Sequence, residues 1–290
     1  MNRLFIFLTL FKISVYATST QPVRIPQKTS RWYVNWNLVD QNVLFAKTHK
    51  GMFSGFYPCC NKFTVLSNNT FSSEHTDEEV KASLNPYSAL GLDVFPTLDL
   101  QEDYLNIYST IPNGFDAVIK NATANTVRNN FDGYMVDYEP SNSTIAHAQA
   151  YAKFLSNLTA SLHAQNKRIG VDLSNWGILD MYHLYAPIDI DIFTSMGTYS
   201  GSDIDANVKV VNQMVSVLNT SRISIGIGSM STTPDANYNW TEYTLNVFLD
   251  FLQDSNITGV DIWRCDIDNA EETNTTLPWF LRVISDWFSS

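Results

Sequence analysis

Two carboxylates separated by one residue lie near the end of the segment Phe131–Pro140, which reads FDGYMVDYEP. The segment is mostly apolar up to Val136 and predicts a buried strand, so Asp137 and Glu139 should extend from the same face at its end. Their Cβ atoms would lie roughly 6–7 Å apart, because a strand rises about 3.3 Å per residue. Each carboxylate then opposes ionisation of the other, which keeps a general acid protonated near neutral pH. Two solvated acids are the alternative, but the apolar strand and its Asp-Gly pair favour an active site.

The same segment resembles the fourth-strand signature of glycoside hydrolase family 18, D-G-x-D-x-D-x-E, which chitinases and endo-β-N-acetylglucosaminidases share. Asp132, Gly133, Asp137 and Glu139 match it, whereas Met135 stands where the family has an aspartate. The resemblance implies that Glu139 is the general acid and that Asp137 orients the substrate's N-acetyl group, whose carbonyl oxygen attacks the anomeric carbon. Such substrate-assisted enzymes are exceptions to the two-carboxylate distance rule. A thioether at position 135 cannot relay charge and hydrogen bonds to Asp137 as a carboxyl would.

Apolar segments that alternate with helical stretches predict the fold. The predicted strands are Arg31–Trp36, Phe53–Pro58, Leu92–Leu98, Phe131–Tyr138, Arg168–Ser174, Ile190–Ser195, Ile223–Gly228 and Gly259–Trp263. The clearest predicted helices are Ala146–Ala164, Asp205–Leu218, Glu242–Leu252 and Pro278–Phe288. Eight strands within about 240 residues, each with room for a crossover, predict a single (β/α)8 barrel. A doubly wound open sheet shows the same alternation, but no Gly-rich phosphate loop follows the first strand.

The ends of the predicted strands supply further candidates, since barrel enzymes carry their chemistry at the C-terminal ends of strands. We assign a catalytic role to Tyr199 beside Asp137 and Glu139. We assign substrate contacts to Trp263, Asp172, Tyr57, Trp36 and Asp99. Aromatic rings stack on the apolar faces of sugars, and carboxylates bind sugar hydroxyls. Tyr57 and Tyr199 fit packing roles equally well, and Asp99 and Asp172 could be polar strand ends.

Two of these residues also take part in the resemblance. Trp263 closes the eighth predicted strand and resembles the tryptophan that forms the floor of the family's sugar subsite. Tyr199 resembles the tyrosine of the sixth-strand pattern M-x-Y-D, in which Gly197 and Ser200 here replace the methionine and the aspartate. The family's third-strand pattern S-x-G-G is absent, and Asp99 follows that strand instead.

The N-terminus and the charge of the chain concern its compartment and partners. Residues 1–19 read as a secretory signal, and residues 20–290 as the barrel domain. Without the signal the chain has 16 basic and 29 acidic groups, a net charge of −13 that opposes binding to nucleic acid and anionic membranes. Eight Asn-x-Ser/Thr triplets lie between the predicted strands, at Asn68, Asn121, Asn142, Asn157, Asn219, Asn239, Asn256 and Asn274. We expect a glycosylated monomer, secreted or in the lysosomal lumen.

The cysteines and histidines show no metal-ligand spacing, so we expect neither a metal nor another cofactor. Cys59 or Cys60 could bridge to Cys265, with three free thiols as the alternative. No later segment is apolar enough to span a membrane.

The sequence thus predicts a retaining glycosidase for β-linked N-acetylglucosamine in chitin-like oligosaccharides or N-glycan cores. One alternative is a sugar-binding barrel with weak or lost catalysis, which Met135, Gly197 and Ser200 favour. The other is a glycosidase for sugars without an acetamido group, for which Asp172 would be the nucleophile, about 5–5.5 Å from the acid.

Overall fold

The computed structural model describes most of the barrel and its helices. The described residues are 27–35, 38–49, 51–59, 61–65, 71–73, 76–100, 114–141, 143–229, 240–265 and 277–290. The predicted signal, Trp36 and four of the Asn-x-Ser/Thr asparagines lie outside these ranges, as do Cys60 and the side chains of Cys59 and Cys265.

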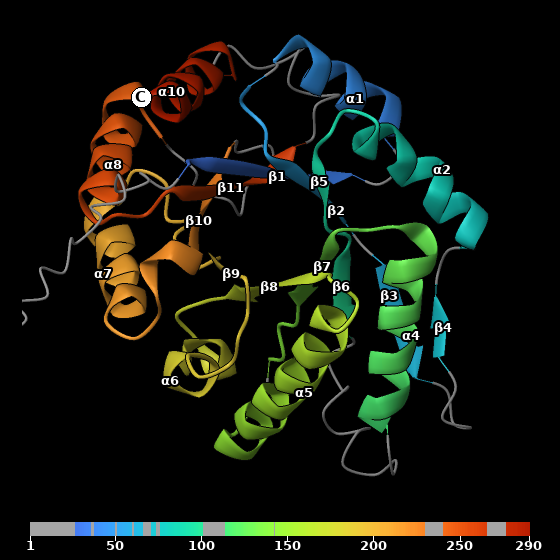
Figure 1. Cartoon of the computed structure of the whole chain (residues 1–290). Coiled ribbons are helices and arrows are strands. Elements are labelled where there is room, and N and C mark those ends of the chain that lie inside the picture. The colour runs from blue at the N-terminus through green and yellow to red at the C-terminus, as the bar shows by residue number, and fades with distance from the viewer. Residues whose placement is uncertain are drawn as a thin grey trace, which may run out of the picture.

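A parallel sheet curls around the centre of the molecule, with helices on its outer face (Figure 1). Its parallel strands are β1 Thr29–Asn35, β2 Gly55–Cys59, β3 Asn61–Val65, β5 Asp93–Val94, β6 Thr97–Leu100, β7 Gly133–Asp137, β8 Arg168–Leu173, β9 Ile192–Ser195, β10 Ile223–Gly228 and β11 Gly259–Cys265. The short strand β4, Phe71–Ser73, pairs antiparallel with β3. The strand order is β4-β3-β6-β7-β8-β9-β10-β11-β1-β2-β5.

The sheet closes through the segment from Asp93 to Leu100, where β5 pairs with β2 and β6 pairs with β3 and β7. Sequence patterning predicts one strand here, but Phe95 and Pro96 interrupt it because proline has no backbone N–H to donate. Backbone hydrogen bonds still run on both sides of the break. The Phe95 N–H donates to the Phe56 carbonyl and the Met135 N–H to the Pro96 carbonyl. The (β/α)8 prediction is thereby confirmed, while β3 and β4 were not predicted.

Helices connect the strands in the predicted order. They are α1 Val39–Thr48, α2 Asp77–Ser88, α4 Gly114–Asn129, α5 Ile145–His163, α6 Tyr182–Tyr185, α7 Ile204–Val215, α8 Glu242–Asp254 and α10 Leu277–Ser289, with 3-10 turns at η1 Gly177–Asp180 and η2 Thr220–Arg222. Capping boxes fix the starts of α2, α5 and α8, at Thr76, Thr144 and Thr241. None of the helices that the structure describes is long and apolar enough to cross a membrane.

Each strand places alternate side chains on its two faces, and this alternation divides the core. On β1, Trp32 and Val34 face outward and join the large apolar core between sheet and helices. Tyr33 faces inward and belongs to a smaller cluster inside the barrel. The other buried members of that cluster are Tyr57, Phe95, Met135 and Ile192, with Trp263 packed at its edge. The barrel interior is therefore filled with side chains up to the level at which the strands end.

Candidate active site

Strand β7 is positioned by the first two residues of the motif. The Asp132 carboxylate accepts a hydrogen bond of 2.8 Å from the Val94 N–H of β5. A Cβ atom at Gly133 would collide with the carbonyl oxygen of Arg168 on β8, so only glycine allows this close approach of strands. Asp132 and Gly133 thus hold β7 in place, and neither needs to touch a substrate.

Asp137 ends β7, and Glu139 follows two residues later, beyond the end of the strand. Their carboxyl groups lie close enough to interact. Partial burial raises the pKa of Glu139, the interaction with Asp137 lowers it, and the charge of Asp99 raises it again. The net rise favours the protonated form, which a general acid requires. Residue Glu139 as a whole is solvent-exposed, so its carboxyl can reach a ligand at the mouth of the barrel.

Three aspartates from neighbouring strands form a row, with Asp137 as its middle member. Asp99 on β6 is the register partner of Asp137 on β7. Val136 pairs with Val171 of β8, which makes Asp137 and Asp172 the next pair along those strands. Asp99 and Asp137 are partly exposed, whereas Asp172 is only 1% exposed.

The deepest of these carboxyls, Asp172, lies inside the barrel. The Tyr33 hydroxyl donates a 2.5 Å hydrogen bond to its Oδ1 atom. Burial raises the pKa of Asp172 well above the usual value, the charge of Asp137 raises it further, and the Tyr33 hydrogen bond lowers it. Asp172 therefore keeps its proton more readily than an exposed aspartate. Its depth does not suit a nucleophile that must reach an anomeric carbon, and it also separates Asp172 from the substrate contact predicted for it.

Three aromatic rings, those of Tyr33, Trp263 and Tyr199, pack together near the C-terminal ends of the strands. Trp263 of β11 is half-buried, and its ring lies 4.9 Å from that of Tyr33 and 6.1 Å from that of Tyr199, nearly parallel to the latter. Tyr199 packs against Gly226 of β10, where an added Cβ would lie 2.7 Å from the tyrosine ring. Glycine at 226 thus leaves the space in which Tyr199 lies beside Trp263. Trp263 and Tyr199 are partly exposed, and their rings form a surface suited to the apolar face of a sugar, whereas Tyr33 is buried.

Tyr57 lies below this surface and is fully buried. Its hydroxyl donates to Asp261 Oδ2 at 3.3 Å, and the Thr194 hydroxyl donates to the same oxygen at 2.5 Å. Arg31, also buried, provides the positive charge beside Asp261. Tyr57 belongs to this buried network, and a direct sugar contact would require the barrel interior to open.

Sequence patterning did not single out Tyr33, Thr194 or Asp261, which support the site from within. Strand period alone would have predicted that Tyr33 and Asp261 face inward. Asp261 lies two residues before Trp263 on β11, and Tyr33 lies two residues before the end of β1. Trp36 lies outside the described residues. Trp176 follows β8 and is 40% exposed, which adds an aromatic side chain near this end of the barrel.

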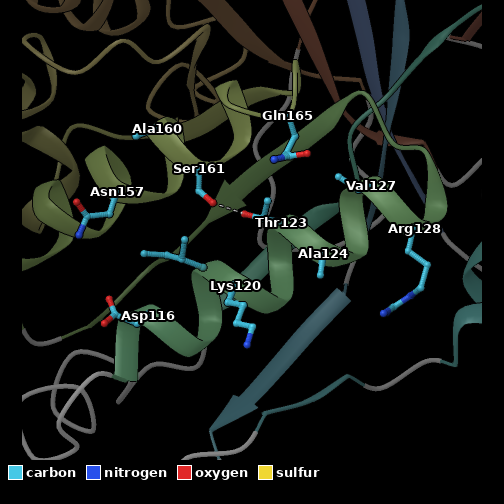
Figure 2. A pocket seen from close by; sticks show the side chains of 11 residues that line it. Asp116, Lys120, Thr123, Ala124, Val127, Arg128, Asn157, Ala160, Ser161 and Gln165 are labelled. Carbon is cyan, nitrogen blue, oxygen red and sulfur yellow. Dashed lines mark hydrogen bonds between the residues drawn. The ribbon is translucent and has the colours of Figure 1, made fainter.

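A separate groove of about 770 Å³ lies on the outside of the barrel between α4 and α5 (Figure 2). The Thr123 and Ser161 hydroxyls lie 2.8 Å apart across it. Asn157, the start of one Asn-x-Thr triplet, lines the groove from α5. None of the predicted site residues lines it, so this groove is distinct from the barrel mouth.

No group of three or more His, Cys, Asp or Glu side chains among the described residues could hold a metal ion.

Comparisons with known proteins relate this architecture to one group of structures. No family model and no curated protein sequence matches the chain. A chitinase from Bacteroides thetaiotaomicron aligns over 90% of this chain and 96% of its own, with a TM-score of 0.71 and 12% identity. A class V chitinase from Nicotiana tobaccum in complex with NAG4 aligns over 91% and 99%, with a TM-score of 0.70 and 10% identity.

A third solved structure is the GH18 chitinase from Cycas revoluta in complex with (GlcNAc)3. It aligns over 90% of this chain and 99% of its own, with a TM-score of 0.68 and 10% identity. The barrel described above therefore has the fold of these glycoside hydrolase family 18 chitinases.

Proposed function

We propose that this protein is a glycosidase that hydrolyses β-linked N-acetylglucosamine in chitin-like oligosaccharides or N-glycan cores. The observation that carries this proposal is the neighbouring pair of carboxyl groups, Asp137 and Glu139, at the C-terminal end of β7. Glu139 is a candidate acid of raised pKa, and the partly exposed rings of Trp263 and Tyr199 stack near the same end of the barrel. The fold shared with chitinases supports the same substrate class.

The proposed reaction is substrate-assisted and retaining. The carbonyl oxygen of the acetamido group forms a bond to the anomeric carbon while the glycosidic C–O bond breaks and Glu139 gives its proton to the leaving oxygen. Asp137 orients the acetamido N–H and stabilises the positive charge that develops on that group. Water then attacks the anomeric carbon from the side that the leaving group has vacated, and Glu139 takes a proton from this water. The bond between the acetamido oxygen and the anomeric carbon breaks at the same time. Configuration at the anomeric carbon is retained because it is inverted twice.

Hydrolysis of fluorogenic N-acetylglucosamine oligomers, set against matched glucose oligomers, tests the proposal. We expect turnover of the former only, with the β-anomer as the first product seen by NMR. Turnover of glucose oligomers alone would overturn the acetamido-dependent mechanism.

A sugar-binding barrel is the second candidate, because Met135 occupies the position of a family carboxyl and is fully buried. Calorimetry with the same N-acetylglucosamine oligomers separates the two. Binding without turnover would assign the protein to this second class.

We also infer that the protein acts in the secretory pathway, as a secreted or lysosomal monomer. Residues 1–19 and the Asn-x-Ser/Thr triplets support this inference. Expression in cultured eukaryotic cells, followed by N-terminal sequencing and glycosidase treatment of the medium fraction, tests it. Retention of an unprocessed chain in the cytosol would contradict it.

A further inference from the structure

Strand β7 lacks one inward carboxyl of the resembled motif, and the structure shows what fills its place. Met135 is fully buried among Tyr33, Tyr57, Phe95 and Ile192. An apolar side chain therefore occupies the barrel interior directly below Asp137, where the family pattern has an aspartate.

A carboxyl is nevertheless present at this depth, on the neighbouring strand. Asp172 of β8 is the next residue across from Asp137, since Val136 pairs with Val171. It is 1% exposed and accepts the hydrogen bond from the Tyr33 hydroxyl described above. Tyr33 thus has a carboxyl partner from β8, while its ring contacts the cluster that contains Met135.

The surroundings of Asp172 favour electrostatic coupling to the proposed catalytic pair. Four titratable groups interact with it. They are Tyr33 of β1, Asp137 at the end of β7, Glu139 just after β7, and Asp261 of β11. Tyr151 of α5 lies close enough for the charge of Asp172 to raise its pKa. Burial, together with the charges of Asp137, Asp261 and Glu139, raises the pKa of Asp172, which favours its neutral form.

We propose that Asp172 is the second inward carboxyl of this site and positions Asp137 from β8, in place of the carboxyl that β7 lacks. This inference rests on the proposed function. Asp172 does not touch the substrate. It supplies a neutral carboxyl against which Asp137 keeps its negative charge and its orientation toward the acetamido group.

The test exchanges the carboxyl between the two strands with Asp172→Ala, Met135→Asp and the double variant. Asp172→Ala should lower kcat on N-acetylglucosamine oligomers about tenfold or more, a coupling typical of neighbours in contact, and should leave KM near the wild-type value. Met135→Asp alone should also lower kcat, because it crowds a further carboxyl against Asp137 and Asp172. The double variant should exceed both single variants in kcat, because one inward carboxyl is again present.

Stability provides a second cycle that does not depend on activity. In urea denaturation, Met135→Asp should destabilise the wild type more than it destabilises Asp172→Ala. Asp116→Ala, which changes an exposed residue of α4, is the matched control. Met135→Asp should destabilise this control variant as much as it destabilises the wild type.

The outcomes separate the two proposals. A wild type that does not turn over the oligomers refutes the proposed function, and the stability cycle then still decides the place of Asp172. Additive effects of Met135→Asp and Asp172→Ala in the stability cycle would overturn the inference. So would an active wild type in which the double variant is no better than the single variants.

Discussion

Met135 and Gly170 face each other across the pair of strands β7 and β8. They are register partners, and a Cβ atom at Gly170 would lie 2.5 Å from Met135 Cε and 2.9 Å from its Sδ. The long thioether therefore extends over a residue that has no side chain. This fit accounts for a fully buried methionine in a strand whose other inward side chain, Asp137, is polar.

We expect Gly170→Ala to destabilise the protein by about 1–3 kcal/mol, the usual effect of overpacking a filled core. The added methyl group must displace the end of Met135, which Tyr33, Tyr57, Phe95 and Ile192 surround. Urea denaturation measures the free energy of unfolding. The double variant with Met135→Ala should recover part of the loss, and an equal loss in both backgrounds would contradict this packing relationship.

Strand period predicted that Met135 and Asp137 share a face of β7, because alternation alone determines which side chains of a strand lie together. Alternation also predicts the face from which the side chains of Asp172 and Tyr57 extend, but it does not predict how deeply they are buried. Both side chains point into the barrel, and both are buried there. Asp172 is hydrogen-bonded to Tyr33, and Tyr57 is hydrogen-bonded to Asp261. Which residues cover which depends on the pairing of strands far apart in the sequence.

The break between β5 and β6 shows the same limit. Pro96 is visible in the sequence, but its effect depends on β2 and β7, which pair with the two halves of the interrupted strand. The short strands β3 and β4 were missed for a related reason. Asn61–Val65 continues the course of β2 after Cys59 and pairs with β6, a contact that no local pattern encodes.

Replacing Glu139 tests the general acid directly. Glu139→Gln keeps the shape and hydrogen-bonding capacity of the side chain but removes the transferable proton. We expect kcat on N-acetylglucosamine oligomers to fall by roughly two to four orders of magnitude, the usual contribution of general acid catalysis. Affinity for the same oligomers, measured by calorimetry, should stay near that of the wild type.

Glu242→Gln is the matched control, because this exposed glutamate starts α8 and pairs with Arg282 outside the barrel mouth. It should leave turnover unchanged. In the wild type, the alkaline limb of kcat/KM should lie above the usual pKa range of glutamic acid, since partial burial raises the pKa of Glu139. A profile that persists in Glu139→Gln would assign the acid to another residue.

Trp263 is expected to carry part of the binding energy for sugar. Trp263→Ala should weaken the affinity for N-acetylglucosamine oligomers by about tenfold, or about 1.4 kcal/mol, because a half-buried ring beside Tyr33 and Tyr199 is removed. Trp263→Phe should lose less. Tyr243→Ala, which removes an aromatic side chain that is 76% exposed on α8, should leave affinity unchanged. Equal affinity for wild type and Trp263→Ala would remove this residue from the site.

Asp172 links the site to the stability of the fold. Its pKa is raised in the folded state by burial, so the folded protein binds more protons than the unfolded chain. The stabilising contribution of this group is therefore fully present below its unfolded pKa, near pH 4, and is lost as the pH rises through its folded pKa. Asp172→Asn keeps an oxygen that can accept the Tyr33 hydrogen bond and does not titrate.

The free energy of unfolding of Asp172→Asn should accordingly change in the variant's favour, relative to wild type, as the pH rises above roughly 4. Urea denaturation at a series of pH values from acid to neutral measures this difference. Asp116→Asn, an exposed substitution on the surface of α4, is the matched control. A difference between Asp172→Asn and wild type that stays constant with pH would mean that Asp172 has the same pKa in the folded and unfolded protein. A buried neutral carboxyl beside Asp137 would then be ruled out.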